Sequence, residues 1–183
     1  MDTVLERPGS TENFLAWEDK QEFKHEFDGR RVIPMTGGSL AHQRIVLNLC
    51  TTLMALLGNK PVVAVQEMRL RIGSQVRYPD VLVCAGPLDQ SIKTLTDALV
   101  IFEVLSDDTA TVDRVDKLID YGRVASLHAY VLLEQTAMAA TLFQRQPEGA
   151  WIASAHTGGD LVLPGFGIAL PLASLYHGLT FAL

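Results

Sequence analysis

Hydrophobic positions recur at two different periods along the chain, and the changes of period mark the expected elements. Apolar residues spaced three and four apart predict a first helix over Thr11–Phe27, a long helix over Leu40–Leu57 and a short helix over Asp113–Val124. Ser39 precedes the long helix as a capping residue, and Gly58 follows it as a stop signal. The segments between these helices have a period of two or are continuously apolar, as strands are.

Two hairpins and two interior strands account for most of these segments. A hairpin is expected over residues 62–84, and a second one over residues 139–155. The runs 99–105 and 129–133 have apolar residues on both parities, which is typical of strands inside a sheet. Because a helix lies between them, we expect a parallel, right-handed crossover. The remaining predictions are a short strand over 30–35 and, over 161–175, an edge strand followed by a helical turn.

This order of elements predicts a mixed α/β fold, more closely an α+β fold with a central mixed sheet flanked by helices. The chain has 183 residues, which is enough to bury a core without disulfides. We therefore expect one domain over residues 1–183, in which residues 1–10 form a flexible N-terminal tail.

Composition and charge exclude several classes of protein. Hydrophobic residues make up 48% of the chain, which excludes a mainly disordered protein. The net charge of −6 excludes a protein that coats nucleic acid through an excess of Lys and Arg. Cys50 and Cys84 lie in apolar runs, as buried thiols of a reducing compartment do. Neither a signal peptide nor an apolar run of membrane-spanning length is recognised, so we expect a cytoplasmic protein that does not engage a membrane.

Two acidic residues lie inside predicted strands. Asp80 falls in the strand that closes the first hairpin, and Glu103 falls in the interior run 99–105. A buried carboxylate costs several kcal/mol unless it is paired or binds a metal. Two neighbouring carboxylates favour a hard divalent cation, Mg²⁺ or Mn²⁺. The alternative is that each acid pairs with an arginine of the hairpin, such as Arg69 or Arg71.

Lys117, on the predicted short helix, is the third candidate for this site. The apolar stripe of that helix consists of Val115, Leu118, Ile119 and Gly122, and Lys117 lies beside it. The alternative for Lys117 is an ordinary solvated lysine on a helix surface.

In combination, the candidate residues and their surroundings resemble the "putative restriction endonuclease" family of the PD-(D/E)XK nuclease superfamily. The resemblance extends over roughly 160 residues from Phe23 onward. The stretches that carry it are Lys24–Gly29, Ala41–Val46, Tyr78–Val81, Phe102–Ser106 and Asp113–Leu118, followed by Tyr121. It implies a restriction endonuclease-like core and a metal-dependent DNA endonuclease that hydrolyses phosphodiester bonds.

The resemblance also implies roles for individual residues. Asp80, Glu103 and the backbone carbonyl of Val104 would hold Mg²⁺ (or Mn²⁺). The third position of the family's Glu-x-Lys triplet is a leucine here, so Lys117 is expected to replace the missing lysine. Glu26, on the predicted first helix, resembles the accessory acid of the superfamily and is expected to act in catalysis or to bind a second metal.

Other residues are candidates for supporting roles. His42 is expected to support the site or contact nucleic acid. Tyr121 is expected either in the core or beside Lys117. Residues 1–90 hold ten lysines and arginines against eleven acids, whereas residues 91–183 hold five against ten.

The basic residues of the first half could contact DNA phosphates. The predicted contacts are Arg69, Arg71 and Arg77. The alternative is that they are solvated charges on a strand. With a net negative charge, we expect DNA binding to be weak and sensitive to salt.

Two other functions stay open from the sequence. The chain could be a catalytically inactive nuclease-fold protein that binds nucleic acid or a protein partner, because the usual strand lysine is missing. A small-molecule hydrolase with the same carboxylate site is a further alternative. A homodimer is expected for the nuclease, because paired cuts in duplex DNA need two active sites.

Overall fold

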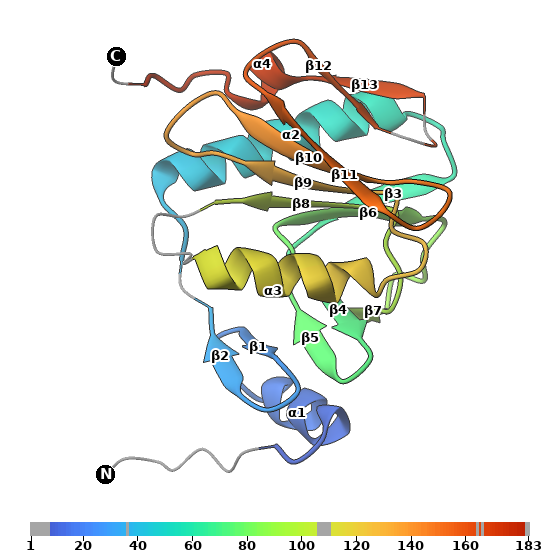
Figure 1. Cartoon of the computed structure of the whole chain (residues 1–183). Coiled ribbons are helices and arrows are strands. Elements are labelled where there is room, and N and C mark those ends of the chain that lie inside the picture. Colours follow the sequence, from blue (N-terminus) through green and yellow to red (C-terminus); the bar gives the residue numbers. More distant parts are fainter. Residues whose placement is uncertain (1–7, 36, 106–110, 164, 166, 182–183) are drawn as a thin grey trace.

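The fold contains two large sheets of unequal size, joined by one bent ribbon, and a separate two-stranded sheet (Figure 1). The computed structural model describes residues 8–35, 37–105, 111–163, 165 and 167–181. The helices are α1 (Thr11–Glu18), α2 (Leu40–Leu57), α3 (Thr111–Gly122) and α4 (Leu172–Leu175). The strands are β1 (His25–Phe27), β2 (Val32–Pro34), β3 (Val62–Gln66), β4 (Arg69–Ile72), β5 (Gln75–Arg77), β6 (Val81–Ala85), β7 (Thr94–Leu95), β8 (Val100–Val104), β9 (Ala129–Leu133), β10 (Ala140–Arg145), β11 (Trp151–His156), β12 (Asp160–Leu163) and β13 (Ile168–Pro171).

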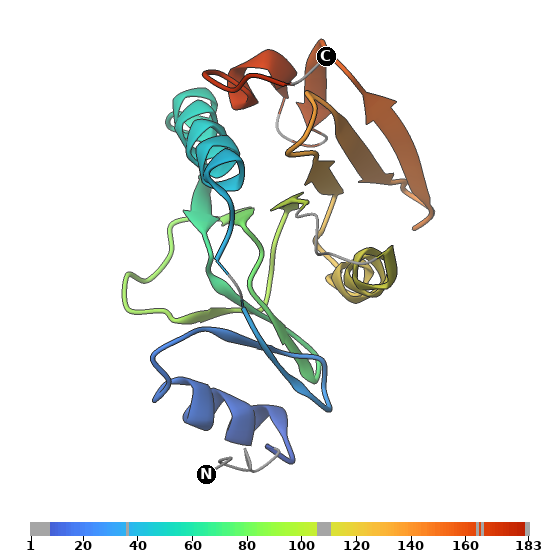
Figure 2. The same cartoon turned by 90° about the vertical axis from the view of Figure 1, so that its left-hand side faces the viewer.

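The larger sheet has six strands in the order β11-β10-β9-β8-β6-β3. Strands β8 and β9 are parallel and the other neighbours are antiparallel, so the sheet is mixed as predicted. Its two faces are covered by different helices (Figure 2). Helix α2 packs Leu49 and Leu53 against Val81 and Phe102 on one face, together with α4 and the β12–β13 hairpin. Tyr121 of α3 joins the core on the other face.

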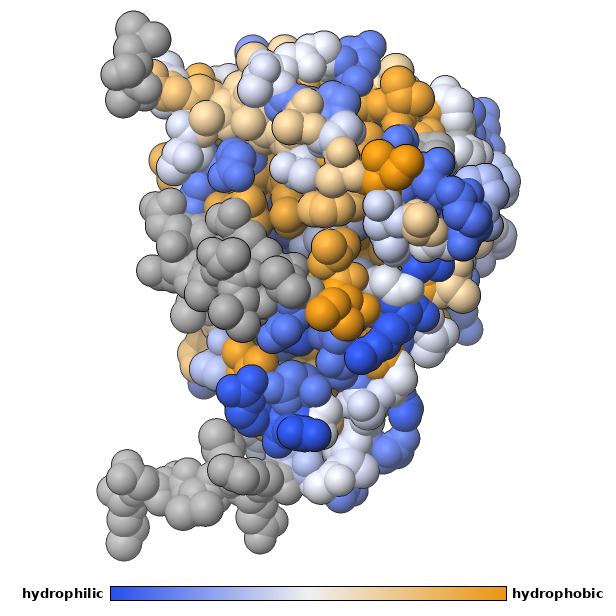
Figure 3. Space-filling view, viewed as in Figure 1, coloured by the Kyte–Doolittle hydropathy of each residue, from blue (hydrophilic) through white to orange (hydrophobic). Residues whose placement is uncertain are grey.

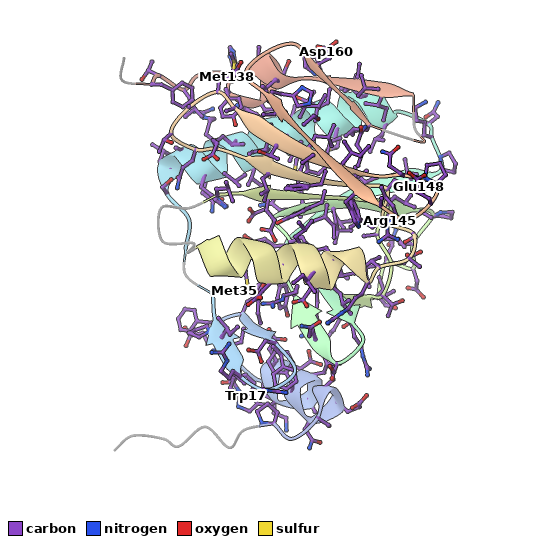
Figure 4. All side chains as sticks on the ribbon, in the orientation of Figure 1. Trp17, Met35, Met138, Arg145, Glu148 and Asp160 are labelled. Carbon is purple, nitrogen blue, oxygen red and sulfur yellow. The ribbon has the colours of Figure 1, made fainter. Side chains whose placement is uncertain are left out.

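The smaller sheet has the order β2-β1-β5-β4-β7 and is covered by α1. Phe14 of α1 stacks on Phe27 of β1 with ring centroids 5.0 Å apart. Trp17, labelled in Figure 4, packs edge-on against His25. The hairpin of β1 and β2 turns at Asp28, whose side chain accepts hydrogen bonds from the backbone of Arg30 and Arg31.

One antiparallel ribbon passes from the larger sheet into the smaller one. Strands β3 and β6 pair in the larger sheet, and β4 and β5, their continuations, pair in the smaller sheet. The ribbon bends at Glu67, which has a φ of +46°, and opposite it at Asp80, whose carbonyl accepts the Glu67 N–H. The predicted continuous strand over 76–84 is therefore wrong over residues 78–80. Pro79 has no N–H to donate there, and the bend places Asp80 between the two sheets.

The predicted first helix is wrong beyond Glu18. Residues 25–27 form β1, which pairs with β2 and supplies the hydrogen bonds that a helix would otherwise provide. Glu26 thus lies on a strand rather than on a helix.

The inward face of α3 also differs from the predicted apolar stripe. Ile119 is 53% exposed, whereas Asp120 and Tyr121 are buried because charged and polar partners face them. Side chains 111–115 lie outside the described part of this helix.

Helix α2 meets a composition criterion that membrane-spanning helices also meet. Within the described residues, α2 is the one helix long and apolar enough, with a mean hydropathy of 1.3, to cross a membrane by composition. The core helix of a water-soluble protein meets the same criterion, and α2 packs one side on the larger sheet. Residues 1–7 of the predicted tail and residues 106–110, which precede α3, lie outside the described residues. Ser10 caps α1.

Candidate active site

Asp80 is held at the bend of the ribbon by two neighbouring elements. Its Oδ2 accepts a hydrogen bond of 2.7 Å from the backbone N–H of Val104, and it lies 3.2 Å from His42 Nε2. The first contact ties the carboxylate to the end of β8, next to Glu103. The structure therefore brings the two acids predicted from the sequence to one place.

His42 reaches Asp80 from the first turn of α2. Ser39 caps this helix by accepting the His42 N–H. The hydrogen bond to Asp80 raises the pKa of the His42 imidazole. A Cβ on Gly38 would lie 2.6 Å from His42 Nδ1, so the glycine makes room for the ring. The ring faces Asp80 and is 12% exposed, which suits the predicted supporting role better than contact with nucleic acid.

Glu103 is buried in β8, at 6% exposure, between a cation and a phenol. Its Oε1 lies 3.3 Å from Lys117 Nζ and accepts a hydrogen bond of 2.6 Å from Tyr121 Oη. Burial raises the pKa of Glu103 to about 7, against the opposing attraction of Lys117, and the charges of Asp80 and Glu26 raise it further. Negative charge therefore exceeds the positive charge that these residues supply.

Lys117 and Tyr121 come from the same face of α3, one turn apart. Tyr121 is fully buried and packs edge-on against Tyr130, so it is part of the core. It also contacts the site through its hydrogen bond to Glu103. The alternative that Lys117 is an ordinary solvated lysine does not hold, because its side chain is 16% exposed and ion-paired.

The hairpin arginines have other partners than Asp80 and Glu103. Arg69 is buried and binds Glu18 and Asp19 of the α1 region as well as Tyr78 Oη. Arg71 pairs with Glu12. These contacts contradict the alternative in which the hairpin arginines neutralise the two strand acids.

Arg77 lies below the site and joins three elements. Its guanidinium binds Glu26 of β1 at 3.0 Å and Asp120 of α3 at 2.7 Å, and all three side chains are buried. The other oxygen of Glu26 accepts the Tyr78 N–H at 3.1 Å. Both oxygens of Glu26 are thus engaged, so its contacts favour a positioning role over the predicted role in catalysis or metal binding.

The predicted phosphate contacts of Arg69 and Arg77 need correction. Both guanidinium groups are buried and committed to carboxylates, because the interior provides the charged partners that keep them there. Burial raises the cost of leaving such a group unpaired, so neither residue is available to a phosphate. Arg71, with its side chain 34% exposed, stays a prediction.

The residues present fit a hard divalent cation. Asp80 and Glu103 supply hard carboxylate oxygens, and the contacts described engage Oδ2 of Asp80 and Oε1 of Glu103. Within the described residues, no group of three His, Cys, Asp or Glu side chains could hold a metal. Mg²⁺ needs few protein ligands, because it keeps several waters and binds substrate phosphate oxygens. Asp80, Glu103 and the Val104 carbonyl would hold it.

Sequence reasoning missed the Arg77–Asp120 ion pair. The sequence feature that points to this ion pair is the position of Asp120, three residues after Lys117 and on the same side of α3. That spacing places a carboxylate beside the lysine, but it does not identify a partner 43 residues away.

Comparisons with known proteins show what the chain as a whole is similar to. The family model described as "Putative restriction endonuclease" (Uma2) matches residues 11–173. Two proteins of Synechocystis sp. (strain PCC 6803), both described as uncharacterized, are 30% identical to this chain. The protein slr1290 matches over 94% of this chain and 93% of its own, and sll1609 over 76% and 82%. The crystal structure of a "putative nuclease belonging to DUF820" from Anabaena variabilis superposes with a TM-score of 0.76 at 14% identity, covering 91% and 97% of the two chains.

Proposed function

Since the chain belongs to the family described as "Putative restriction endonuclease" and has a restriction endonuclease-like fold, we propose that it is a Mg²⁺-dependent DNA endonuclease that hydrolyses phosphodiester bonds. Mn²⁺ would serve in place of Mg²⁺. The proposal adds the metal, the substrate and the reaction to the nuclease family assignment.

One observation supports this function above the others: a lysine and a second carboxylate converge on a buried glutamate. Lys117 Nζ lies 3.3 Å from Glu103, and Asp80 binds the backbone of the residue that follows Glu103. A protein that only needed stability would gain little from one buried and one partly buried acid beside one lysine. Their excess negative charge suits a bound cation, and that cation would in turn attract a phosphate substrate.

Each residue has a defined task in this reaction. A divalent cation held by Asp80 and Glu103 would acidify a water and offset charge on the scissile phosphate. Lys117 orients the attacking water or donates to the phosphate oxygens as their negative charge grows. His42 and the Val104 N–H fix Asp80 Oδ2, and Tyr121 fixes Glu103 Oε1, so that the remaining oxygens keep their positions.

Cleavage assays with purified variants test the proposal. Duplex DNA is incubated with Mg²⁺ or Mn²⁺ and the wild-type chain, Asp80→Ala, Glu103→Ala or Lys117→Met. We expect the lysine variant to lose about 100-fold or more in rate, as expected for removal of one transition-state donor. Asp160→Ala is the control, because this exposed residue begins β12 at the top of Figure 4, on the opposite side of the larger sheet from α3. Equal cleavage by all variants would identify a contaminant and refute the proposal.

The alternative is a catalytically inactive relative that binds nucleic acid or a protein partner. The absence of a lysine from β8 favours it. DNA binding without any cleavage by the wild-type chain would support this alternative. We also propose that the chain forms a homodimer. Sedimentation equilibrium of the purified protein would test this.

A further inference from the structure

A groove lined by arginines lies between α3, β5 and the turn that joins β1 to β2. Its volume is about 550 Å³, and four arginines and three aspartates line it. Arg30 and Arg31 come from the turn, and Arg123 directly follows α3. Figure 3 shows a largely hydrophilic surface over the lower part of this face, where these elements meet. We call this feature the arginine groove.

Three of the four arginines present donors to the solvent. The side chain of Arg31 is 76% exposed and uses Nε to bind Asp28, and that of Arg123 is 60% exposed and uses one terminal nitrogen to bind Gln75 and Asp120. Each guanidinium has five N–H groups, so both keep donors for a ligand. Arg30 is also exposed. Arg77, in contrast, is buried in the wall.

The arginines that line the groove outnumber the aspartates by four to three. Arg77 and Arg123 both bind Asp120, Arg31 binds Asp28, and Asp116 is exposed. The lining is therefore slightly positive, by one charge, on a chain with a net charge of −6. An anion with several oxygens fits exposed guanidinium forks best, and a phosphate group is such an anion.

The groove adjoins the candidate active site. Asp116 and Asp120 line it from α3, and Lys117 lies between them in sequence. Arg77 and Asp120 form part of its wall, and Arg77 also binds Glu26, whose charge acts on Glu103. A strand whose scissile phosphate lay at Glu103 and Lys117 would have further phosphates close to this groove.

We propose that the arginine groove binds the phosphate backbone of the DNA substrate next to the point of cleavage, through Arg30, Arg31 and Arg123. This inference rests on the proposed function. It replaces the predicted contacts of Arg69 and Arg77, which are buried, with three arginines that are exposed.

Binding without cleavage tests the groove separately from catalysis. A fluorescent 30-base-pair duplex is titrated in EDTA at several salt concentrations. The triple variant Arg30→Ala/Arg31→Ala/Arg123→Ala is expected to bind about tenfold or more weakly at low salt, with a salt slope smaller by about 2 to 3. The matched control replaces the exposed Lys20, Lys60 and Lys93 by Ala, which gives the same change of net charge outside the groove. A triple Arg→Lys variant keeps the charge and should keep the salt slope.

The outcomes separate the two proposals. Equal affinity and equal salt slope in the arginine variant and the lysine control would refute DNA binding by the arginine groove, even if the chain cleaves DNA. Undetectable DNA binding by the wild-type chain would also overturn it. Arginine-dependent binding by a chain that never cleaves DNA would support the groove and refute the nuclease activity.

Discussion

Replacing Glu103 by glutamine should make the stability of the metal-free protein less dependent on pH. Burial raises the pKa of Glu103 from 4.5 to about 7. The folded state therefore retains a proton that the unfolded state has lost in this range. For such a group, stability is present at low pH and is lost as pH rises between the unfolded and the folded pKa. The full shift corresponds to about 3 kcal/mol.

Most of this loss falls between pH 5 and pH 8. Glutamine keeps an oxygen that can accept from Tyr121 and Lys117 but cannot ionise. We therefore expect the unfolding free energy of Glu103→Gln, relative to wild type, to increase by about 2 kcal/mol from pH 5 to pH 8. Urea unfolding in EDTA at the two pH values measures this difference.

A matched variant and an added metal make this test specific. Glu148→Gln removes an exposed carboxylate in the turn between β10 and β11, far along the chain from the site, and is the control. We expect the stability of this variant relative to wild type to change little between the two pH values. If Mg²⁺ binds as proposed, 10 mM Mg²⁺ at pH 8 should stabilise the wild type and have little effect on Glu103→Gln. A relative stability of Glu103→Gln that is the same at both pH values would refute the electrostatic account of this site.

Two further predictions concern the residues around the site. Arg77→Ala should lower the unfolding free energy by about 3–5 kcal/mol, because it removes the ion-pair partner of buried Glu26 and leaves buried Asp120 with only the exposed Arg123. Adding Asp120→Asn should recover part of the loss in urea unfolding. A lack of any recovery would contradict the ion-pair explanation. Gly38→Ala should displace the His42 ring and return its raised pKa toward the ordinary value, which NMR titration measures. Gly37→Ala, with open space around its Cβ, is the control, and an unchanged His42 pKa in both variants would contradict the steric account.

The sequence predicted elements whose signal is local. Helix α2 and the parallel pair of β8 and β9 follow from periodicity and from apolar runs, and the structure confirms them. Asp80 and Glu103 were singled out because charges inside apolar runs are conspicuous in the sequence, whereas the role of Lys117 was implied by the family resemblance. The features taken from periodicity and from apolar runs depend on a few neighbouring residues, so a single sequence is enough to find them.

The errors arise where distant partners decide the conformation. Glu26 was assigned to a helix, but β1 forms because β2 and β5 supply its hydrogen bonds. Arg69 and Arg77 were assigned to a surface, since charged residues are mostly exposed, yet each is buried and has at least one buried acidic partner 43 to 51 residues away. Ile119 was assigned to the core because its helix face was judged by apolar residues alone.

The ribbon shared by the two sheets has a mechanical consequence. Glu103 lies on a strand of the larger sheet, Arg77 lies on a strand of the smaller sheet, and Asp80 lies in the bend between them. A change in the angle between the sheets would therefore alter the spacing of the two carboxylates. The bridge from Arg77 to Asp120 clamps the smaller sheet to α3 and so resists this rotation. The spacing of Asp80 and Glu103 thus depends on how rigid the bend of the ribbon is. Substitutions in the core under α1 would shift the smaller sheet and, through this bend, change the spacing of the two carboxylates.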